Sequence, residues 1–130
     1  MLASDLVLVI EDDDDIRDVM REVLAAEGFR VETARDGVEA LRKLESGAEK
    51  PVILLDMMMP KMDGEAFVKA LRSAPALADA PIVVISGSTA AREKAHALGA
   101  AACLVKPFEL DELLSVVRRL TRTAAGEAHP

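Results

Sequence analysis

The fold is decided by residues 51–56, PVILLD, where an unbroken apolar run ends at an aspartate, Asp56. A strand that is apolar at every position, instead of at alternate ones, is typical of a strand buried on both faces. Four further segments are predicted strands: residues 6–10, 29–34, 82–85 and 101–105. Helical stretches separate them. Strands that alternate with helices predict an α/β fold, in which helices cover both faces of a parallel sheet.

Five helices are predicted, and most carry apolar residues three and four positions apart. Asp13 or Asp14 is expected to cap the first helix and Gly28 to end it. The second covers residues 36–46, and the fourth, about residues 89–98, has only a weak apolar face. The expected inward-facing residues are Ile16, Val19, Met20, Val23 and Leu24 in the first helix, Val38, Leu41 and Leu44 in the second, Phe67, Ala70 and Leu71 in the third, and Leu110, Leu113, Leu114, Val117 and Leu120 in the fifth.

Length and composition indicate one globular domain over residues 1–121, with residues 122–130 as a tail or the start of a linker. Acidic residues outnumber basic ones, 23 to 16, and the net charge of −7 argues against nucleic-acid binding. No apolar stretch approaches the roughly 20 residues that span a bilayer. The single cysteine excludes an internal disulfide, and we expect a cytoplasmic protein.

Polar residues directly follow four of the predicted strands. Glu11 and Asp12 follow the first, Asp56 the third, Ser86 the fourth and Lys106 the fifth. In an open parallel sheet, ligand sites form outside the carboxyl ends of the strands. Each residue alone has an ordinary explanation as a turn, cap or surface residue. Their joint occurrence at strand ends predicts one site.

The residue types at this edge indicate phosphoryl chemistry. Three neighbouring carboxylates repel each other at neutral pH, and a hard divalent cation such as Mg²⁺ relieves that repulsion. Asp56 could then act as a nucleophile towards phosphorus. A lysine ammonium and a serine hydroxyl, from Lys106 and Ser86, suit the oxygens of a phosphoryl group in transfer.

The sequence resembles the response-regulator receiver family of two-component signalling. The resemblance covers about residues 6–120 and rests on VLVIEDD at 7–13, DGVEAL at 36–41, LLDMMMPKMDG at 54–64, IVVISG at 82–87 and LVKPF at 104–108. It implies a flavodoxin-like, doubly wound sheet of five parallel strands in the order 2-1-3-4-5, with five helices.

The resemblance also implies the metal and the donor. Asp56 would accept the phosphoryl group from a phosphohistidine on a histidine kinase or a histidine phosphotransfer protein. Asp12, Asp56 and the main-chain carbonyl of Met58 would ligate Mg²⁺, or Mn²⁺ in its place, and Glu11 would act mainly through water. Slow self-hydrolysis would follow, so the chain is expected to be a switch and not an enzyme.

Further roles follow from the same resemblance. Ser86, Gly87 and Lys106 would contact the phosphoryl group, and the Lys106–Pro107 peptide bond would be cis. Met58 and Ser88 occupy the positions that tune the lifetime of the acyl phosphate.

Two departures from the family pattern concern the output. Cys103 stands three residues before the lysine, where the family has a tyrosine or phenylalanine that takes part in the switch. The segment from Ser86 to Lys106 is also about two residues shorter than the family pattern. The downstream protein partner is not specified by the sequence, and a dimer formed on phosphorylation is one further expectation.

Other classes of function share parts of this pattern. Aspartyl-nucleophile phosphohydrolases place a second aspartate two residues after the nucleophile, where this chain has Met58, which cannot transfer protons. A receiver-like module that only binds would lack the acceptor, an acidic partner or the lysine, and this chain has them all. A flavodoxin-like cofactor carrier would need a phosphate-binding loop after the first strand, and none is present there.

Overall fold

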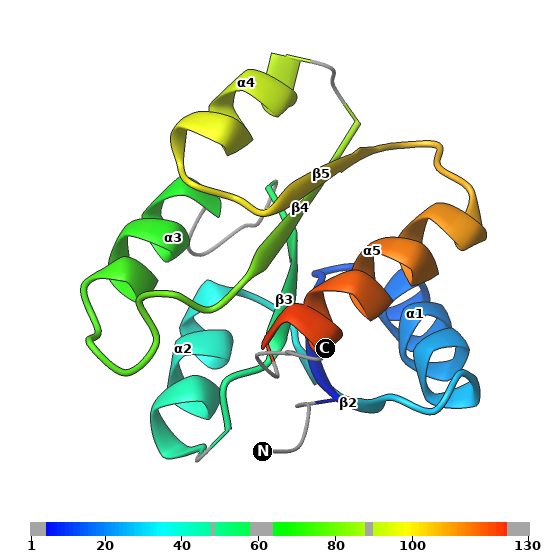
Figure 1. Cartoon of the computed structure of the whole chain (residues 1–130), viewed down its shortest axis with the longest axis horizontal. Coiled ribbons are helices and arrows are strands. Elements are labelled where there is room, and N and C mark those ends of the chain that lie inside the picture. The colour runs from blue at the N-terminus through cyan, green and yellow to red at the C-terminus, as the bar shows by residue number, and fades with distance from the viewer. Residues whose placement is uncertain (1–4, 48, 58–63, 88–89, 125–130) are drawn as a thin grey trace.

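The computed structural model describes residues 5–47, 49–57, 64–87 and 90–124 (Figure 1). A parallel sheet of five strands forms the centre, in the order β2-β1-β3-β4-β5. The strands are β1 (Leu6–Ile10), β2 (Arg30–Ala34), β3 (Val52–Asp56), β4 (Ile82–Ser86) and β5 (Ala102–Val105). The predicted α/β class and the strand order that the resemblance implied are therefore confirmed.

The three central strands are apolar at nearly every position, which suits strands that are covered on both faces. Every residue of β1, β3 and β4 is buried, as the unbroken apolar runs predicted. Strand β2 lies at one edge and, among the described strands, pairs only with β1. Its first four residues alternate between exposed and half-buried because successive side chains point to opposite faces, and Val31 packs against the core under α1 and α5. Strand β5 lies at the opposite edge and pairs with β4.

Helices cover the sheet on both faces (Figure 1). Helices α1 (Asp14–Ala26) and α5 (Leu110–Ala124) lie on one face, and α2 (Gly37–Ser46), α3 (Gly64–Arg72) and α4 (Ala90–Ala97) lie on the other. Successive strand residues point to opposite faces, so two cores result. The core under α1 and α5 contains Val7, Val9, Met20, Leu24, Leu54, Leu113 and Val117. The core under α2, α3 and α4 contains Leu8, Ile10, Leu44, Leu55, Phe67, Leu71 and Ala95.

Side-chain caps fix where the first two helices begin. Asp13 caps α1 by accepting a hydrogen bond from the Ile16 N–H at 3.0 Å. Asp36 caps α2 by accepting one from the Glu39 N–H at 2.8 Å. These bonds satisfy donors that the first turn of a helix leaves unpaired. Because each cap lies within three residues of a strand end, both helices begin near the carboxyl edge of the sheet.

Several predicted inward-facing residues are exposed. Ile16 and Val38 are each 41% exposed, Leu110 is 48% exposed and Val19 is 59% exposed. Ile16, Val38 and Leu110 lie in the first turns of α1, α2 and α5, which begin beyond the ends of the strands and have less of the sheet beneath them. Val19 lies in the middle of α1, where Met20 and Leu24 are the buried residues. The apolar periodicity therefore identified the helices correctly but overestimated how much of each apolar face is buried.

The last helix is longer than predicted. Helix α5 continues to Ala124, into residues 122–130, which are predicted as a tail or the start of a linker. No glycine or proline occurs between Leu110 and Ala124, so nothing in the backbone chemistry ends the helix earlier.

Candidate functional site

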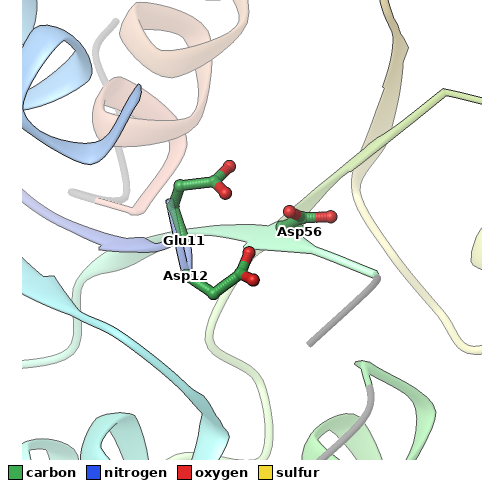
Figure 2. Close-up of side chains that lie close together, drawn as sticks. All are labelled: Glu11, Asp12 and Asp56. Carbon is green, nitrogen blue, oxygen red and sulfur yellow. The ribbon is translucent and has the colours of Figure 1, made fainter. Parts of the chain in front are cut away.

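Three carboxylates meet at the carboxyl edge of the sheet (Figure 2). Glu11 and Asp12 follow β1 directly, and Asp56 is the last residue of the adjacent strand β3. One carboxylate oxygen from each residue lies within 4.8 Å of the others. Glu11 and Asp56 are buried and Asp12 is exposed. The convergence predicted from the strand ends is therefore present for these three residues.

The pKa of the Glu11 carboxyl is shifted strongly by its surroundings. Burial raises the pKa of the Glu11 carboxyl from 4.5 to about 7, and the negative charge of Asp56 contributes in the same direction. The Asp13 N–H, which donates to Glu11 Oε2 at 3.1 Å, and the positive charge of Lys106 oppose the rise in the pKa. A second positive charge near these carboxylates would let all three ionise at neutral pH.

The cluster fits a small divalent cation. All three side chains offer oxygen, the ligand type that Mg²⁺ prefers. Magnesium ligands lie at about 2.0–2.1 Å from the ion, so ligands on opposite sides of one ion lie about 4 Å apart. The three oxygens lie within 4.8 Å of one another, which is compatible with that span, and exposed Asp12 can adjust. Glu11, Asp12 and Asp56 could thus hold Mg²⁺.

Ser86 and Lys106 lie at the ends of the next two strands. Ser86 is the last residue of β4 and is buried, and Lys106 follows β5 and is half-buried. The Lys106 N–H donates to the Ser86 carbonyl at 2.7 Å, so the two strand ends are joined directly. The Lys106–Pro107 peptide bond is cis, the isomer that the resemblance implied. Gly87 is exposed, and a Cβ at this position would meet nothing within 4 Å.

The other three predicted site residues are Met58, Ser88 and Cys103. Met58 and Ser88 lie outside the described residues. Cys103 lies on β5 beside Val84 and packs, half-buried, against the core under α2, α3 and α4. Burial raises the pKa of its thiol, and the positive charge of Arg92 opposes that rise.

The structure adds contacts that we did not predict from the sequence. Arg17 reaches back from α1 and donates from Nη1 to the Glu11 carbonyl at 2.9 Å. Met57, directly after Asp56, accepts a hydrogen bond from the Gly64 N–H at 3.3 Å. The spacing of Arg17 three residues after Asp14 indicates an ion pair between these two residues, but it does not indicate the bond to the Glu11 carbonyl.

Comparison with known proteins identifies the family. Residues 7–118 match the family model described as "Response regulator receiver domain". The chain belongs to this family. The match includes Glu11, Asp12, Asp56, Ser86 and Lys106, so the receiver domain contains the whole strand-end site.

The receiver domain resembles both curated and solved relatives. It is 38% identical over 126 residues to "Response regulator MprA" of Mycobacterium sp. (strain KMS), covering 95% of this chain and 54% of that protein. It resembles the solved chemotaxis protein CheY4 of Vibrio cholerae at a TM-score of 0.80 and 37% identity, covering 88% of this chain and 97% of that one. Response regulator protein TrrA of Thermotoga maritima, solved in complex with Mg²⁺ and BeF, matches at a TM-score of 0.78 and 32% identity, with coverage of 88% and 97%.

The receiver domain spans about half the length of the curated relatives that it matches. It is a receiver domain of two-component response regulators, the phosphoacceptor switch that the sequence indicated. None of the helices within the described ranges combines the length and the apolar character that crossing a membrane requires.

Proposed function

We propose that this receiver domain accepts a phosphoryl group on Asp56 in a Mg²⁺-dependent reaction. The donor is a phosphohistidine on a histidine kinase or a histidine phosphotransfer protein. The observation that carries the proposal is the meeting of the Glu11, Asp12 and Asp56 carboxylates, with oxygens within 4.8 Å of one another, at the edge where Ser86 and Lys106 also lie. The solved complex of TrrA with Mg²⁺ and BeF, a relative of this chain, supports the choice of cation.

The chemistry follows from the position of Asp56. One of its carboxylate oxygens attacks phosphorus, a P–O bond forms, and the P–N bond to the donor histidine breaks. The electron pair of that bond returns to the imidazole nitrogen, which takes up a proton. Water later attacks phosphorus, and the P–O bond to Asp56 breaks to give inorganic phosphate and the free carboxylate. The second step is slow, so the domain works as a switch and not as an enzyme with an external substrate.

The surrounding residues divide the work of binding. The Mg²⁺ ligands would be Asp12, Asp56 and the Met58 carbonyl, and Glu11 would act mainly through water. Mn²⁺ could take the place of Mg²⁺. When bound, the cation neutralises negative charge on the carboxylates and on the phosphoryl oxygens. Ser86, Gly87 and Lys106 would contact the phosphoryl oxygens from the adjacent strand ends, and Met58 and Ser88 would set how easily water reaches the acyl phosphate.

The output is a change in protein–protein contacts. Because Cys103 replaces the family's aromatic residue, the signal would leave through Ser86 and the backbone that joins it to Lys106. The hydrogen bond from the Lys106 N–H to the Ser86 carbonyl, 2.7 Å long, supports this route. The occupant of the output surface is a downstream protein, or a second copy of the phosphorylated chain.

Intact mass measurement after treatment with acetyl phosphate and Mg²⁺ tests the proposal. The wild-type protein should gain an adduct of about 80 Da, the mass of one phosphoryl group bound as an acyl phosphate. Asp56→Ala should gain none, and a chelator should prevent the gain in the wild type. Asp111→Ala, which changes an exposed aspartate in the first turn of α5, is the matched control and should still be phosphorylated.

Two results would contradict the proposal. An adduct that persists in Asp56→Ala would place the acceptor elsewhere. No adduct on the wild type, in the presence of Mg²⁺, would favour a module that only binds.

A further inference from the structure

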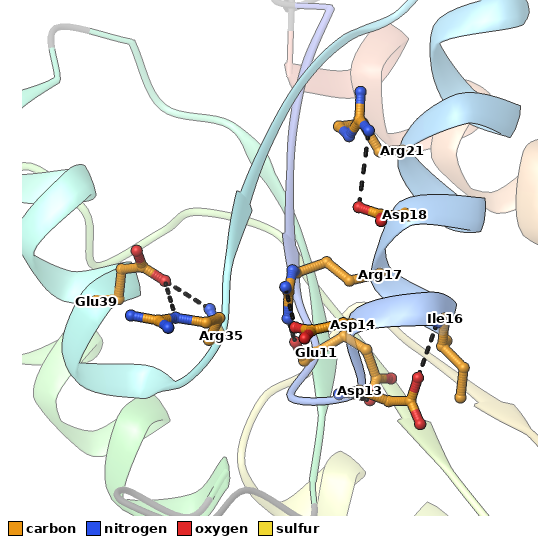
Figure 3. A network of polar contacts seen from close by, with 9 residues as sticks. All are labelled: Glu11, Asp13, Asp14, Ile16, Arg17, Asp18, Arg21, Arg35 and Glu39. Carbon is orange, nitrogen blue, oxygen red and sulfur yellow. Dashed lines mark hydrogen bonds and ion pairs between the residues drawn. The ribbon is translucent and has the colours of Figure 1, made fainter.

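Arg17 of α1 reaches back to Glu11, one of the three acidic residues of the site (Figure 3). Its guanidinium donates from Nη1 to the Glu11 carbonyl at 2.9 Å and from Nη2 to a carboxylate oxygen of Asp14. The side chain of Arg17 is only 13% exposed, although it comes from a helix with an exposed outer face. The fixed fork of a guanidinium suits such a bridge, because its donors keep a constant angle to one another.

The contact from Arg17 completes the restraint of Glu11. The Glu11 N–H donates to the Ala34 carbonyl of β2 at 3.0 Å, and the Glu11 carboxylate accepts from the Asp13 N–H at 3.1 Å. Arg17 holds the remaining polar group, the Glu11 carbonyl. That carbonyl belongs to the peptide bond leading to Asp12, so its orientation sets the direction in which the Asp12 side chain leaves the backbone.

We propose that Arg17 is a positioning residue of the acidic site: by bridging the Glu11 carbonyl and Asp14, it fixes the turn that presents Glu11 and Asp12 to the cation. This inference rests on the proposed function. Residues that orient metal ligands without touching the metal commonly change metal affinity by about 10–100-fold when they are lost.

The same helix contains a matched control. Arg21 lies one turn further along α1, its side chain is 48% exposed, and it pairs only loosely with Asp18 at 3.6 Å. Arg17→Met and Arg21→Met remove the same charge from the same helix. A difference between them therefore reports the bridge and not the overall charge. Arg17→Lys keeps the charge, but a single ammonium lacks the fork that holds both partners in a fixed geometry.

Titration calorimetry of Mg²⁺ into the full chain is the deciding experiment, since the protein has no tryptophan or tyrosine to report binding by fluorescence. We expect Arg17→Met to bind Mg²⁺ roughly tenfold more weakly than the wild type. Arg21→Met should stay within about twofold, and Arg17→Lys should lie closer to Arg17→Met. At saturating Mg²⁺, phosphorylation of Arg17→Met by acetyl phosphate should recover towards the wild-type rate.

The outcomes separate the two proposals. Equal Mg²⁺ affinity in Arg17→Met and Arg21→Met, or wild-type affinity in Arg17→Lys, would overturn the inference and leave the proposed function intact. A wild-type protein that binds no Mg²⁺ would overturn the proposed function, and the inference with it. Circular dichroism checks the fold of each variant, and if Arg17→Met does not fold, Arg17→Lys alone decides.

Discussion

Gly64 lies directly against Met57. The N–H of Gly64, the first residue of α3, donates to the Met57 carbonyl at 3.3 Å. A Cβ at Gly64 would lie 2.5 Å from Met57 Sδ and 3.0 Å from Met57 Cα. The sulfur belongs to a flexible side chain that could turn away, but the Cα belongs to the backbone. Since Met57 follows Asp56, this contact ties the start of α3 to the residue beside the proposed acceptor.

Gly64→Ala is therefore expected to destabilise the protein. The added methyl group must displace the Met57 backbone, and overpacking of this kind typically costs about 1–3 kcal/mol. Urea unfolding measured by circular dichroism gives the change in the free energy of unfolding. Gly87→Ala is the control for stability, because a Cβ there meets nothing within 4 Å, and it should change the free energy of unfolding by less than about 0.5 kcal/mol. Equal effects of the two substitutions would show that the contact with Met57 does not constrain position 64.

Lys106→Ala is expected to separate phosphorylation from its structural consequence. The carboxylates at the ends of β1 and β3 remain, so acetyl phosphate should still produce the adduct on Asp56, while loss of the ammonium removes one partner of the phosphoryl oxygens. Backbone NMR shifts of β4 and β5, compared with and without beryllofluoride, measure the response. We expect smaller shifts in Lys106→Ala than in Lys94→Ala, whose lysine pairs with Glu65 at the surface. Shift changes as large as those of the wild type would exclude this role for Lys106.

Without metal, stability should fall as the pH rises through neutrality. The pKa of Glu11 is raised from 4.5 to about 7, mainly by burial. The charge of Asp56 and a hydrogen bond with Asp12 also raise this pKa, whereas the Asp13 N–H and the charge of Lys106 lower it. Between these pH values the folded state binds more protons than the unfolded state. The stabilisation is complete below about pH 4.5 and is lost as the pH passes 7.

Urea unfolding in the presence of a chelator, at several pH values from 5 to about 8, measures this effect. Glu11→Gln cannot lose the proton, so its free energy of unfolding should decrease less over the same range. Added Mg²⁺ should reduce the decrease in the wild type, because a bound cation favours the ionised carboxylates. Parallel pH profiles for the wild type and Glu11→Gln would refute the assignment to Glu11.

Cys103 should react slowly with thiol reagents. Burial raises the pKa of its thiol, and the opposing charge of Arg92 does not cancel the rise, so little thiolate is present at neutral pH. Alkylation by iodoacetamide, followed by mass spectrometry, gives one rate because the chain has a single cysteine. The folded protein should react several times more slowly than the chain unfolded in urea. A folded-state rate equal to or above the unfolded rate would mean that Cys103 is an activated thiol.

The residues that define the fold could be predicted from the sequence because their local chemistry matches their place in the folded protein. The runs at residues 6–10, 52–55 and 82–85 are apolar at every position, and all three are buried central strands. Asp13 and Asp36 are good helix caps, and both cap helices. The strand-end rule for parallel sheets then brought Glu11, Asp12 and Asp56 together without any knowledge of distances.

Other features could not be predicted from the sequence, because they depend on three-dimensional geometry that the spacing of apolar residues does not specify. Ile16 and Val38 match the apolar period of their helices, yet they are exposed because those helices begin beyond the strand ends. The contact from Arg17 to the Glu11 carbonyl depends on how the turn between β1 and α1 folds back, and no side-chain pattern encodes a bond to a backbone carbonyl.

Only one of the three carboxylates in the cluster is exposed to solvent. Glu11 and Asp56 are buried and only Asp12 is exposed, so an ion arriving from solvent meets Asp12 first, and a departing ion leaves it last. If the site holds Mg²⁺ as proposed, we expect the exposed Asp12 to affect the rates of ion entry and exit more than the buried Glu11 and Asp56 do. Neutralising Asp12 should then change the rate at which the domain takes up Mg²⁺ as well as its affinity for the ion.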